Sequence, residues 1–352
     1  MCKIINIKLI TKKLPLLQTY LLSYGEITEF RANIISIKLD DGNSGISESI
    51  ALPGYGTETD DQLKSILLTY CKLLVDKEID EAIKLLNENY IRGSFAFSTI
   101  LSALEIAKKS FIPPNNFEIP VAGIISTNDK QKILSDLRNL TERGYRTIKV
   151  KLGKNIKNDI ENIESLLEYS DGDINFRFDA NQAYDFNETV SLLEHVKGIN
   201  QDKIQLFEQP MDIYSWKEYA TLSELFETPI MLDESIFTEK DIDKAADVGA
   251  SFVKLKLCKH RGINNLIYLA EKASALGMKV ILGNGIATDI SNLIELWLYA
   301  AKPNLFFGAI ESNGFLKLNM GGLLPVKIIF NNGHLLWDNN NDEGSTEEFH
   351  IQ

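Results

Sequence analysis

The sequence predicts an α/β protein whose main part is a TIM-type (β/α)8 barrel. Its 352 residues allow a large core, and eight short apolar runs alternate with longer helix-like segments between about residues 120 and 325. Five consecutive runs end at charged residues, Lys151, Asp179, Glu208, Asp233 and Lys256, with intervals of 28, 29, 25 and 23 residues. Each interval accommodates one strand and one helix, the repeating unit of such a barrel.

The eight apolar runs are the predicted barrel strands. In chain order they read VAGII, YRTIKVKL, INFRFDA, IQLFEQP, PIMLDE, SFVKLKL, KVILGNG and LFFGAIE. The segments between them mix polar and apolar residues, as surface helices do. A doubly wound sheet is the alternative fold, but no GxGxxG motif follows any predicted strand to support it.

The part ahead of the barrel has a different organisation. The segment IISIKLDDGNSGISES alternates apolar and polar residues around a DG turn, which predicts a β-hairpin. Helix-like stretches follow at about residues 60–77, 80–88 and 95–109. Together these elements predict an α+β domain.

The proline-rich connector FIPPNNFEIP is the best candidate for a domain boundary. We therefore expect a capping domain over residues 1–115 and a catalytic barrel over residues 116–325. Residues 326–352 are expected to return to the capping domain and to end in a mobile tail, because DNNNDEGSTEEFHIQ is polar and of low complexity.

Composition narrows the class of protein. The chain has 49 acidic and 37 basic residues and a net charge of −12, which argues against a nucleic-acid partner. Its cysteines, Cys2, Cys71 and Cys258, are too widely spaced for a disulfide framework or a CxxC site. The sequence contains no HxxxH pair, so a zinc hydrolase is not expected. We expect a cytoplasmic enzyme with no membrane partner, since the N-terminus lacks a signal-peptide core and the run NLIELWLYAA falls short of the roughly 18 residues of a membrane span.

The strand TIKVKLG carries two lysines, Lys149 and Lys151, in an otherwise apolar run. Side chains two residues apart on a strand share a face, so both ammonium groups point the same way. The carboxyl end of a barrel strand lies at the catalytic face. We therefore expect these lysines to project over the mouth of the barrel.

Three carboxylates are expected at the same level, Asp179 in RFDAN, Glu208 in FEQP and Asp233 in LDES. Three ionised carboxylates cannot lie together without a counter-charge. A hard divalent cation with oxygen ligands supplies that charge, and Mg²⁺ fits best. Lys254 and Lys256 follow on the sixth run, opposite the second run in an eight-stranded barrel.

This arrangement suits removal of a proton from the carbon next to a carboxylate. A metal bound to the carboxylate stabilises the enediolate that forms. One lysine removes the proton and a second, on the opposite wall, returns one to the other face, so the carbon is inverted. Each motif taken alone also has an ordinary structural explanation: KxK as a solvated strand face, and LDES and Asn181 as helix caps. Their order and regular spacing favour the functional explanation.

The motifs KVK, DAN, EQP, DES and KLK, in this order, resemble those of the enolase superfamily, specifically the muconate-lactonizing-enzyme subgroup. The resemblance runs over nearly the whole chain and implies a capping domain, a barrel and one Mg²⁺ per subunit. It implies that Lys151 and Lys256 are the acid/base pair. Lys149 would contact the substrate carboxylate, and Lys254 would be a supporting residue.

The resemblance also assigns the acidic residues of these motifs. Asp179, Glu208 and Asp233 would be the metal ligands. Asn181 and Glu234 would contact the ligands rather than the metal. The resemblance further implies a homo-oligomer.

Within the subgroup, the segments RFDANQAY, FEQPMD and TPIMLDESIF are most similar to dipeptide epimerases such as those acting on L-Ala-D/L-Glu. Those enzymes usually carry Asp-x-Asp at the end of the eighth strand to bind the ammonium group of the dipeptide, where this chain has Ala309 and Glu311. Glu311 is the expected substrate-binding residue there. Ile286 is a further candidate, next to Ala287, where related epimerases often have Glu.

The early loop of the capping domain, about residues 23–31, is expected to select the substrate. It contains Glu26, a candidate substrate-binding residue, and Glu29, which would favour a neutral or cationic second residue. The leading hypothesis is a Mg²⁺-dependent epimerase of L-Ala-L-Xaa dipeptides that acts in murein peptide metabolism.

Other hypotheses stay open. N-acylamino acid racemisation or o-succinylbenzoate synthesis on the same scaffold is the nearest one. Muconate cycloisomerisation is a third, and a barrel that binds a small anion without turnover is a fourth. A nucleophilic Cys258 is disfavoured, since His260 is the only histidine near it in the sequence.

Overall fold

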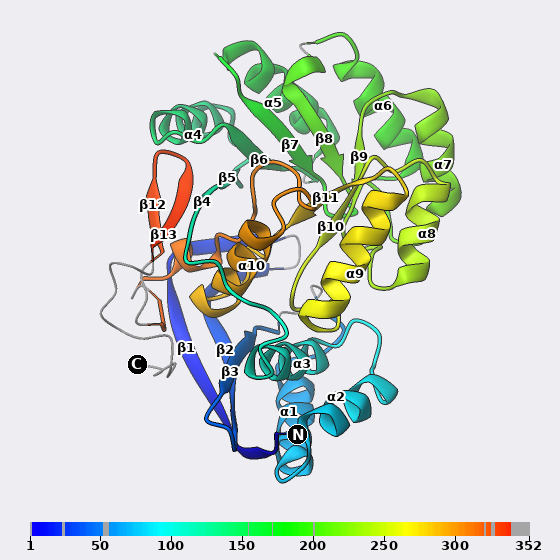
Figure 1. Ribbon diagram of the computed structural model, residues 1–352. Coiled ribbons are helices and arrows are strands. Elements are labelled where there is room, and N and C mark those ends of the chain that lie inside the picture. The colour runs from blue at the N-terminus through cyan, green and yellow to red at the C-terminus, as the bar shows by residue number, and fades with distance from the viewer. Residues whose placement is uncertain are drawn as a thin grey trace.

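The computed structural model describes residues 2–22, 25–51, 56–153, 155–170, 172–199, 201–319, 322–324 and 328–338. Its strands form an antiparallel sheet of order β1-β2-β3, a parallel sheet of order β11-β10-β9-β8-β7-β6-β5, and a small sheet of order β12-β13-β4. Figure 1 shows the first sheet and helices α1–α3 at one end of the molecule and the parallel sheet at the other.

The N-terminal part contains the predicted hairpin and helices. The elements are β1 (Ile4–Leu22), β2 (Gly25–Leu39), β3 (Ser44–Ser49), α1 (Asp60–Leu74), α2 (Ile79–Glu88) and α3 (Phe95–Ala107). Strands β2 and β3 pair antiparallel across a turn in which Gly42 has a φ of +88°, so the DG turn is confirmed. Helix α3 is apolar on most sides because it packs between the sheet and the barrel helix α9 (Gly262–Ala275).

The barrel strands fall where the apolar runs predict them. They are β5 (Gly123–Ile125), β6 (Thr147–Lys151), β7 (Asn175–Asp179), β8 (Ile204–Glu208), β9 (Ile230–Leu232), β10 (Phe252–Leu255) and β11 (Lys279–Leu282). The helices between and after them are α4 (Lys130–Glu142), α5 (Ile156–Tyr169), α6 (Phe186–Val196), α7 (Trp216–Leu225), α8 (Glu239–Asp247), α9 and α10 (Asp289–Ala301). Figure 1 shows α4–α9 around the parallel sheet and α10 close to the N-terminal sheet.

The eighth run forms no regular strand, yet it closes the ring. The amides of Phe307 and Glu311 donate to the carbonyls of Val280 and Leu282 on β11, at 2.8 and 3.1 Å. Ile310 exchanges hydrogen bonds with the other edge of the sheet, through the Pro120 carbonyl and the Ala122 amide. Residues 305–311 therefore occupy the position of the eighth strand, and the (β/α)8 prediction is confirmed.

The C-terminal strands pair with the entrance to the barrel. Strands β12 (Ile329–Asn331) and β13 (His334–Asp338) form a hairpin, and β13 pairs antiparallel with β4 (Asn116–Pro120). Residues expected to form only a connector thus become a strand. The described C-terminal strands join β4 and not the N-terminal sheet, and the tail predicted to be mobile lies outside the described residues. The domain limits stay a prediction.

The N-terminal part also caps a barrel helix. A carboxylate oxygen of Glu105 on α3 accepts hydrogen bonds from the amides of Ile263 and Asn264, in the first turn of α9, at 2.6 and 3.3 Å. A helix start leaves amides unsatisfied and favours a negative group beside them. The two parts of the chain are therefore joined by hydrogen bonds as well as by apolar packing.

Candidate active site

The three expected metal ligands lie on neighbouring strands. Asp179 and Glu208 end β7 and β8 and stand opposite each other in the strand register, and Asp233 follows β9 directly. All three side chains are buried. Lysines on or shortly after the two flanking strands, β6 and β10, bind all three carboxylates.

Lys149 links two of these carboxylates. Its Nζ lies 2.8 Å from Asp179 Oδ2 and 2.5 Å from Glu208 Oε2. Two carboxylates that share one ammonium group must point at the same place. The expected convergence of Asp179 and Glu208 is therefore present in the structure.

Lys151 reaches the rim of the same cluster. Its Nζ lies 2.7 Å from Asp179 Oδ2 and 2.6 Å from Asn181 Oδ1, and it is more exposed than Lys149. The side-chain amide of Asn181 donates through Nδ2 to Glu234 Oε1 at 2.9 Å. Asn181 has a φ of +45°, in the left-handed region that asparagine tolerates, so the tight turn after β7 holds it beside Lys151.

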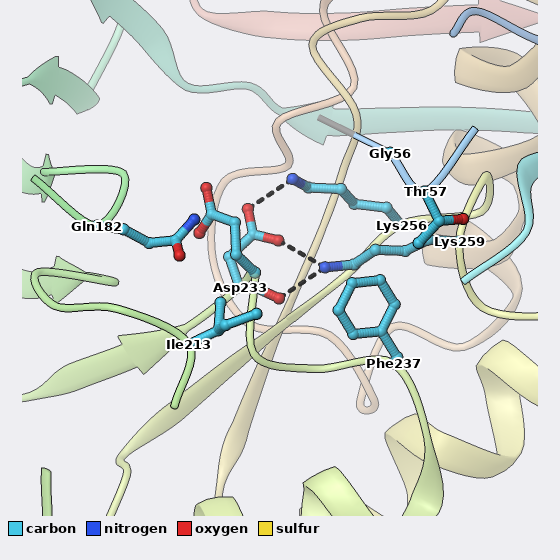
Figure 2. Close-up of a pocket in the computed structure, with 9 residues that line it drawn as sticks. Gly56, Thr57, Gln182, Ile213, Asp233, Phe237, Lys256 and Lys259 are labelled. Carbon is cyan, nitrogen blue, oxygen red and sulfur yellow. Dashed lines mark hydrogen bonds and ion pairs between the residues drawn. The ribbon is translucent and has the colours of Figure 1, made fainter. Parts of the chain in front are cut away.

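Lys256 occupies the opposite side of the cluster. It follows β10, and strands β7, β8 and β9 separate it from Lys151 on β6. Its Nζ lies 2.5 Å from Asp233 Oδ2. Figure 2 shows Lys256 and Lys259 approaching Asp233 side by side.

Lys259 and Arg177 are functional candidates that the sequence analysis missed. The Nζ of Lys259 donates to the Asp233 carbonyl at 2.6 Å and to its Oδ1 at 2.9 Å, and it lies over the Phe237 ring. Arg177 is fully buried and binds Glu311 at 3.0 Å. The sequence carried a signal for Arg177, because it stands two residues before Asp179 and so shares its face.

Burial and charge act strongly on the titration of these groups. Burial raises the pKa of Glu208 to about 8 and the Asp179 charge adds to this, while Lys149 and Lys254 lower the pKa by less. Burial would also raise the pKa of Asp233, but Lys256, Lys259 and Lys254 together hold it well below its usual range. The carboxylates Asp179, Glu208 and Glu311 hold the pKa of Lys149 well above its usual value, although burial opposes them.

A cavity of about 210 Å³ opens beside Lys256. The residues that line it come from both parts of the chain: Gly56, Thr57, Gln182, Ile213, Asp233, Glu234, Phe237, Lys256 and Lys259. Figure 2 shows Gln182 and Ile213 on one side of Asp233, and Phe237 and Thr57 near the lysines. The cavity therefore offers a small substrate access to one of the two proposed acid/base lysines.

None of the four expected substrate-binding residues is in this lining: Lys149, which is described above, and Glu26, Ile286 and Glu311. Glu26 is exposed on β2 opposite Leu21, so the segment expected to be a loop is largely hairpin strand, and its tip residues Ser23 and Tyr24 lie outside the described residues. Ile286 is buried in the turn after β11, and its amide donates to Asn284 Oδ1 at 3.1 Å. Glu311 is buried among cations.

The donor set fits a hard divalent cation. The described part of the chain contains no group of three or more His, Cys, Asp or Glu side chains already arranged around a metal position. Lysine ammonium groups instead connect the carboxylates of Asp179, Glu208 and Asp233. Oxygen ligands are those that Mg²⁺ prefers.

The chain is similar in sequence to proteins named as epimerases and racemases. The L-Ala-D/L-Glu epimerase of Clostridium acetobutylicum is 24% identical over 303 residues, which cover 82% of this chain and 84% of that protein. The N-succinyl-L-Arg/Lys racemase of Bacillus cereus is 25% identical over 332 residues, covering 90% of this chain and 88% of that protein. Epimerases and racemases are isomerases, so the expectation of an isomerase is confirmed.

A solved structure gives the same fold. The dipeptide epimerase of Enterococcus faecalis, complexed with Mg and the dipeptide L-Leu-L-Tyr, superposes with a TM-score of 0.84 at 18% identity, covering 96% of this chain and 97% of that one. No helix in the described residues has the length and apolar character to cross a membrane. Residues 132–338 match the family described as Enolase C-terminal domain-like, and the chain belongs to that family.

Proposed function

We propose that the protein is a Mg²⁺-dependent dipeptide epimerase that inverts the α-carbon of the second residue of L-Ala-L-Xaa dipeptides. One observation carries the proposal: Lys151 and Lys256 stand on opposite walls of a barrel mouth that contains three buried carboxylates. The relatives named as dipeptide epimerases support it. We further propose a cytoplasmic, homo-oligomeric enzyme, as the family resemblance implies.

Inversion requires a proton to leave one face of the α-carbon and another to arrive on the opposite face. In the proposed reaction Lys151, beside Asp179 and Asn181, serves one face, and Lys256, beside Asp233, serves the other. Each lysine acts as base for one enantiomer and as acid for the other. Asn181 and Asp233 fix the two ammonium groups in position.

Mg²⁺ held by Asp179, Glu208 and Asp233 would supply the positive charge that stabilises the enediolate formed from the substrate carboxylate. The protein itself contributes burial. The three carboxylates are buried, so each charge in the cluster acts at close range in a medium of low polarity.

A second candidate, racemisation of N-acyl or N-succinyl amino acids, is favoured by one specific observation. Ala309 offers no charge at the end of the eighth run, and the carboxylate of Glu311 already binds three cations. A substrate without a free amino group needs no acidic partner there. The relative named N-succinyl-L-Arg/Lys racemase covers 90% of this chain.

Proton NMR in D₂O with Mg²⁺ tests both candidates together. L-Ala-L-Xaa dipeptides and N-succinyl amino acids with the same side chains would be offered separately to the enzyme. Loss of the second-residue α-proton with a new diastereomer supports dipeptide epimerisation, whereas exchange confined to the N-succinyl compounds supports the second candidate. Absence of exchange in both sets overturns the proposed chemistry.

A further inference from the structure

Glu311 is the meeting point of three cationic side chains. Its Oε2 lies 3.0 Å from Lys149 Nζ and accepts a second, shorter hydrogen bond from Lys254, and its Oε1 accepts from Arg177 Nη1 at 3.0 Å. The side chain is buried. It is not among the residues that line the cavity beside Lys256.

The position of Glu311 is fixed from two sides. The same Nη1 of Arg177 donates to the carbonyl of Ala309 at 2.9 Å, and Arg177 Nε donates to Gln205 at 2.6 Å. Gly283 packs so closely against Glu311 that a Cβ there would lie 2.6 Å from its backbone. This glutamate therefore belongs to a rigid part of the barrel interior.

The two lysines that bind Glu311 also bind the proposed metal ligands. Lys149 contacts Asp179 and Glu208, as described above. Lys254 Nζ lies 3.3 Å from Glu208 Oε1 and 4.0 Å from Asp233 Oδ2. Each lysine is thus shared between Glu311 and the acidic triad.

A divalent cation bound to Asp179, Glu208 and Asp233 would compete with Lys149 and Lys254 for the same carboxylate oxygens. Like charges repel strongly in a buried site, so ammonium groups and a metal cannot share the same carboxylate oxygens at full strength. The lysines must then rely on another carboxylate. Glu311 already contacts both of them, so they need only give up their contacts with the triad.

We propose that Glu311 is a positioning residue for the metal site: it retains Lys149 and Lys254 when a divalent cation binds to Asp179, Glu208 and Asp233. This inference rests on the proposed metal site and differs from the substrate-binding role expected from the sequence. Glu311 in this role makes metal binding compatible with two buried lysines. Lys254 competes with the metal, and Glu311 reduces that competition.

If Glu311 supports metal binding and Lys254 competes with the metal, substitutions of these two residues should change the Mg²⁺ affinity in opposite directions. Glu311→Gln removes the alternative partner of the lysines, so the Kd for Mg²⁺ should rise by about tenfold or more, as for other residues that orient metal ligands. Lys254→Met removes a competing cation, so the Kd should fall. Loss of general structural integrity would instead weaken Mg²⁺ binding in both variants.

Isothermal titration of the full-length protein with Mg²⁺ alone measures these constants without any substrate. Glu311→Asp keeps the charge and should bind Mg²⁺ more tightly than Glu311→Gln. Glu105→Gln, which changes a buried glutamate whose hydrogen bonds are with the α9 amides of Ile263 and Asn264, is the matched control and should leave the Kd unchanged. Near-ultraviolet circular dichroism of each metal-free variant checks the fold.

An unchanged Kd in Glu311→Gln, or Kd shifts in the same direction in Glu311→Gln and Lys254→Met, would overturn the inference. If Glu311→Gln does not fold, a Kd in Lys254→Met that is equal to or above the wild-type value overturns it instead. Failure of the proposed function is a separate result. It would appear as the expected Mg²⁺ shifts without α-proton exchange in any substrate.

Discussion

Lys259 binds Asp233 twice, through the backbone carbonyl at 2.6 Å and through the side-chain Oδ1 at 2.9 Å. The same carboxylate binds Lys256 through its other oxygen, at 2.5 Å. One residue thus fixes the backbone and the side chain of a proposed metal ligand while a proposed acid/base lysine binds the other oxygen. Lys259 stands three residues after Lys256, within the turn of residues 257–261 that leads into α9.

Lys259→Met should lower kcat by about 10- to 100-fold, because Asp233 loses the cation that orients it, and such supporting residues have effects of this size. Lys259→Arg keeps the charge and should retain more activity. Steady-state kinetics on the substrate identified by NMR, together with Mg²⁺ titration, measure the effect. Wild-type kinetics in Lys259→Met would show that Asp233 needs no such support.

Lys151→Ala and Lys256→Ala should each reduce epimerisation by about 10² to 10⁴, the range for loss of a general acid or base. Each variant should still exchange the α-proton of one enantiomer with solvent, because the other lysine is intact. Deuterium incorporation into each pure diastereomer, followed by NMR, shows this selectivity. Normal epimerisation in both single variants would contradict the two-base mechanism.

Glu105→Gln should weaken the dependence of stability on pH. Burial raises the pKa of Glu105 from 4.5 to about 7, so the folded state binds more protons than the unfolded state between these values. The contribution of this group to the free energy of unfolding is complete below pH 4.5 and is lost as the pH rises through 7. For one carboxyl group with a pKa shift of this size, the loss is roughly 3 kcal/mol. A glutamine still accepts from the two α9 amides but does not ionise.

Urea unfolding of wild type and Glu105→Gln at pH 5 and pH 8 tests this expectation. The variant should lose less stability between the two pH values. Some loss will remain, because burial also raises the pKa of Glu48 and of Glu295 to about 7. Equal losses in the two proteins would mean that Glu105 titrates normally.

Gly45→Ala should destabilise the N-terminal part. A Cβ at Gly45 on β3 would lie 2.0 Å from the carbonyl oxygen of Ala103 and 2.6 Å from the amide of Ala107, both on α3. Overpacking of this kind costs about 1–3 kcal/mol. Thermal or urea unfolding measures the cost, with Ser44→Ala on the same strand as the control, and equal stability of the two variants would show that α3 moves away at little cost.

Much of the barrel was predictable because local patterns determine it. Residues ending consecutive strands of a parallel sheet meet at one edge, so the spacing of Asp179, Glu208 and Asp233 was enough to bring them together. The eighth run showed the limit of this argument. Its apolar pattern is that of a strand, but its hydrogen bonds to β11 and to Pro120 and Ala122, just ahead of β5, are too few and irregular to form a regular ladder.

The cavity could not be predicted in the same way. Gly56 and Thr57 line it although they lie some two hundred residues from Lys256, and no period or spacing connects these segments. The sequence drew attention to Glu26, which the long hairpin places on an exposed strand. Lys259 was missed because its role depends on how the turn after β10 folds back onto Asp233.

The pairing of β13 with β4 has a consequence for how the chain is made. Strand β4 runs directly into β5, the first strand of the barrel, and its hydrogen-bonding partner β13 is synthesised more than two hundred residues later. Chains fold progressively from the N-terminus as the ribosome releases them. The edge of β4 must therefore stay without this partner until residues 334–338 have been made, so the entrance to the barrel gains its final hydrogen bonds long after β4 itself is synthesised.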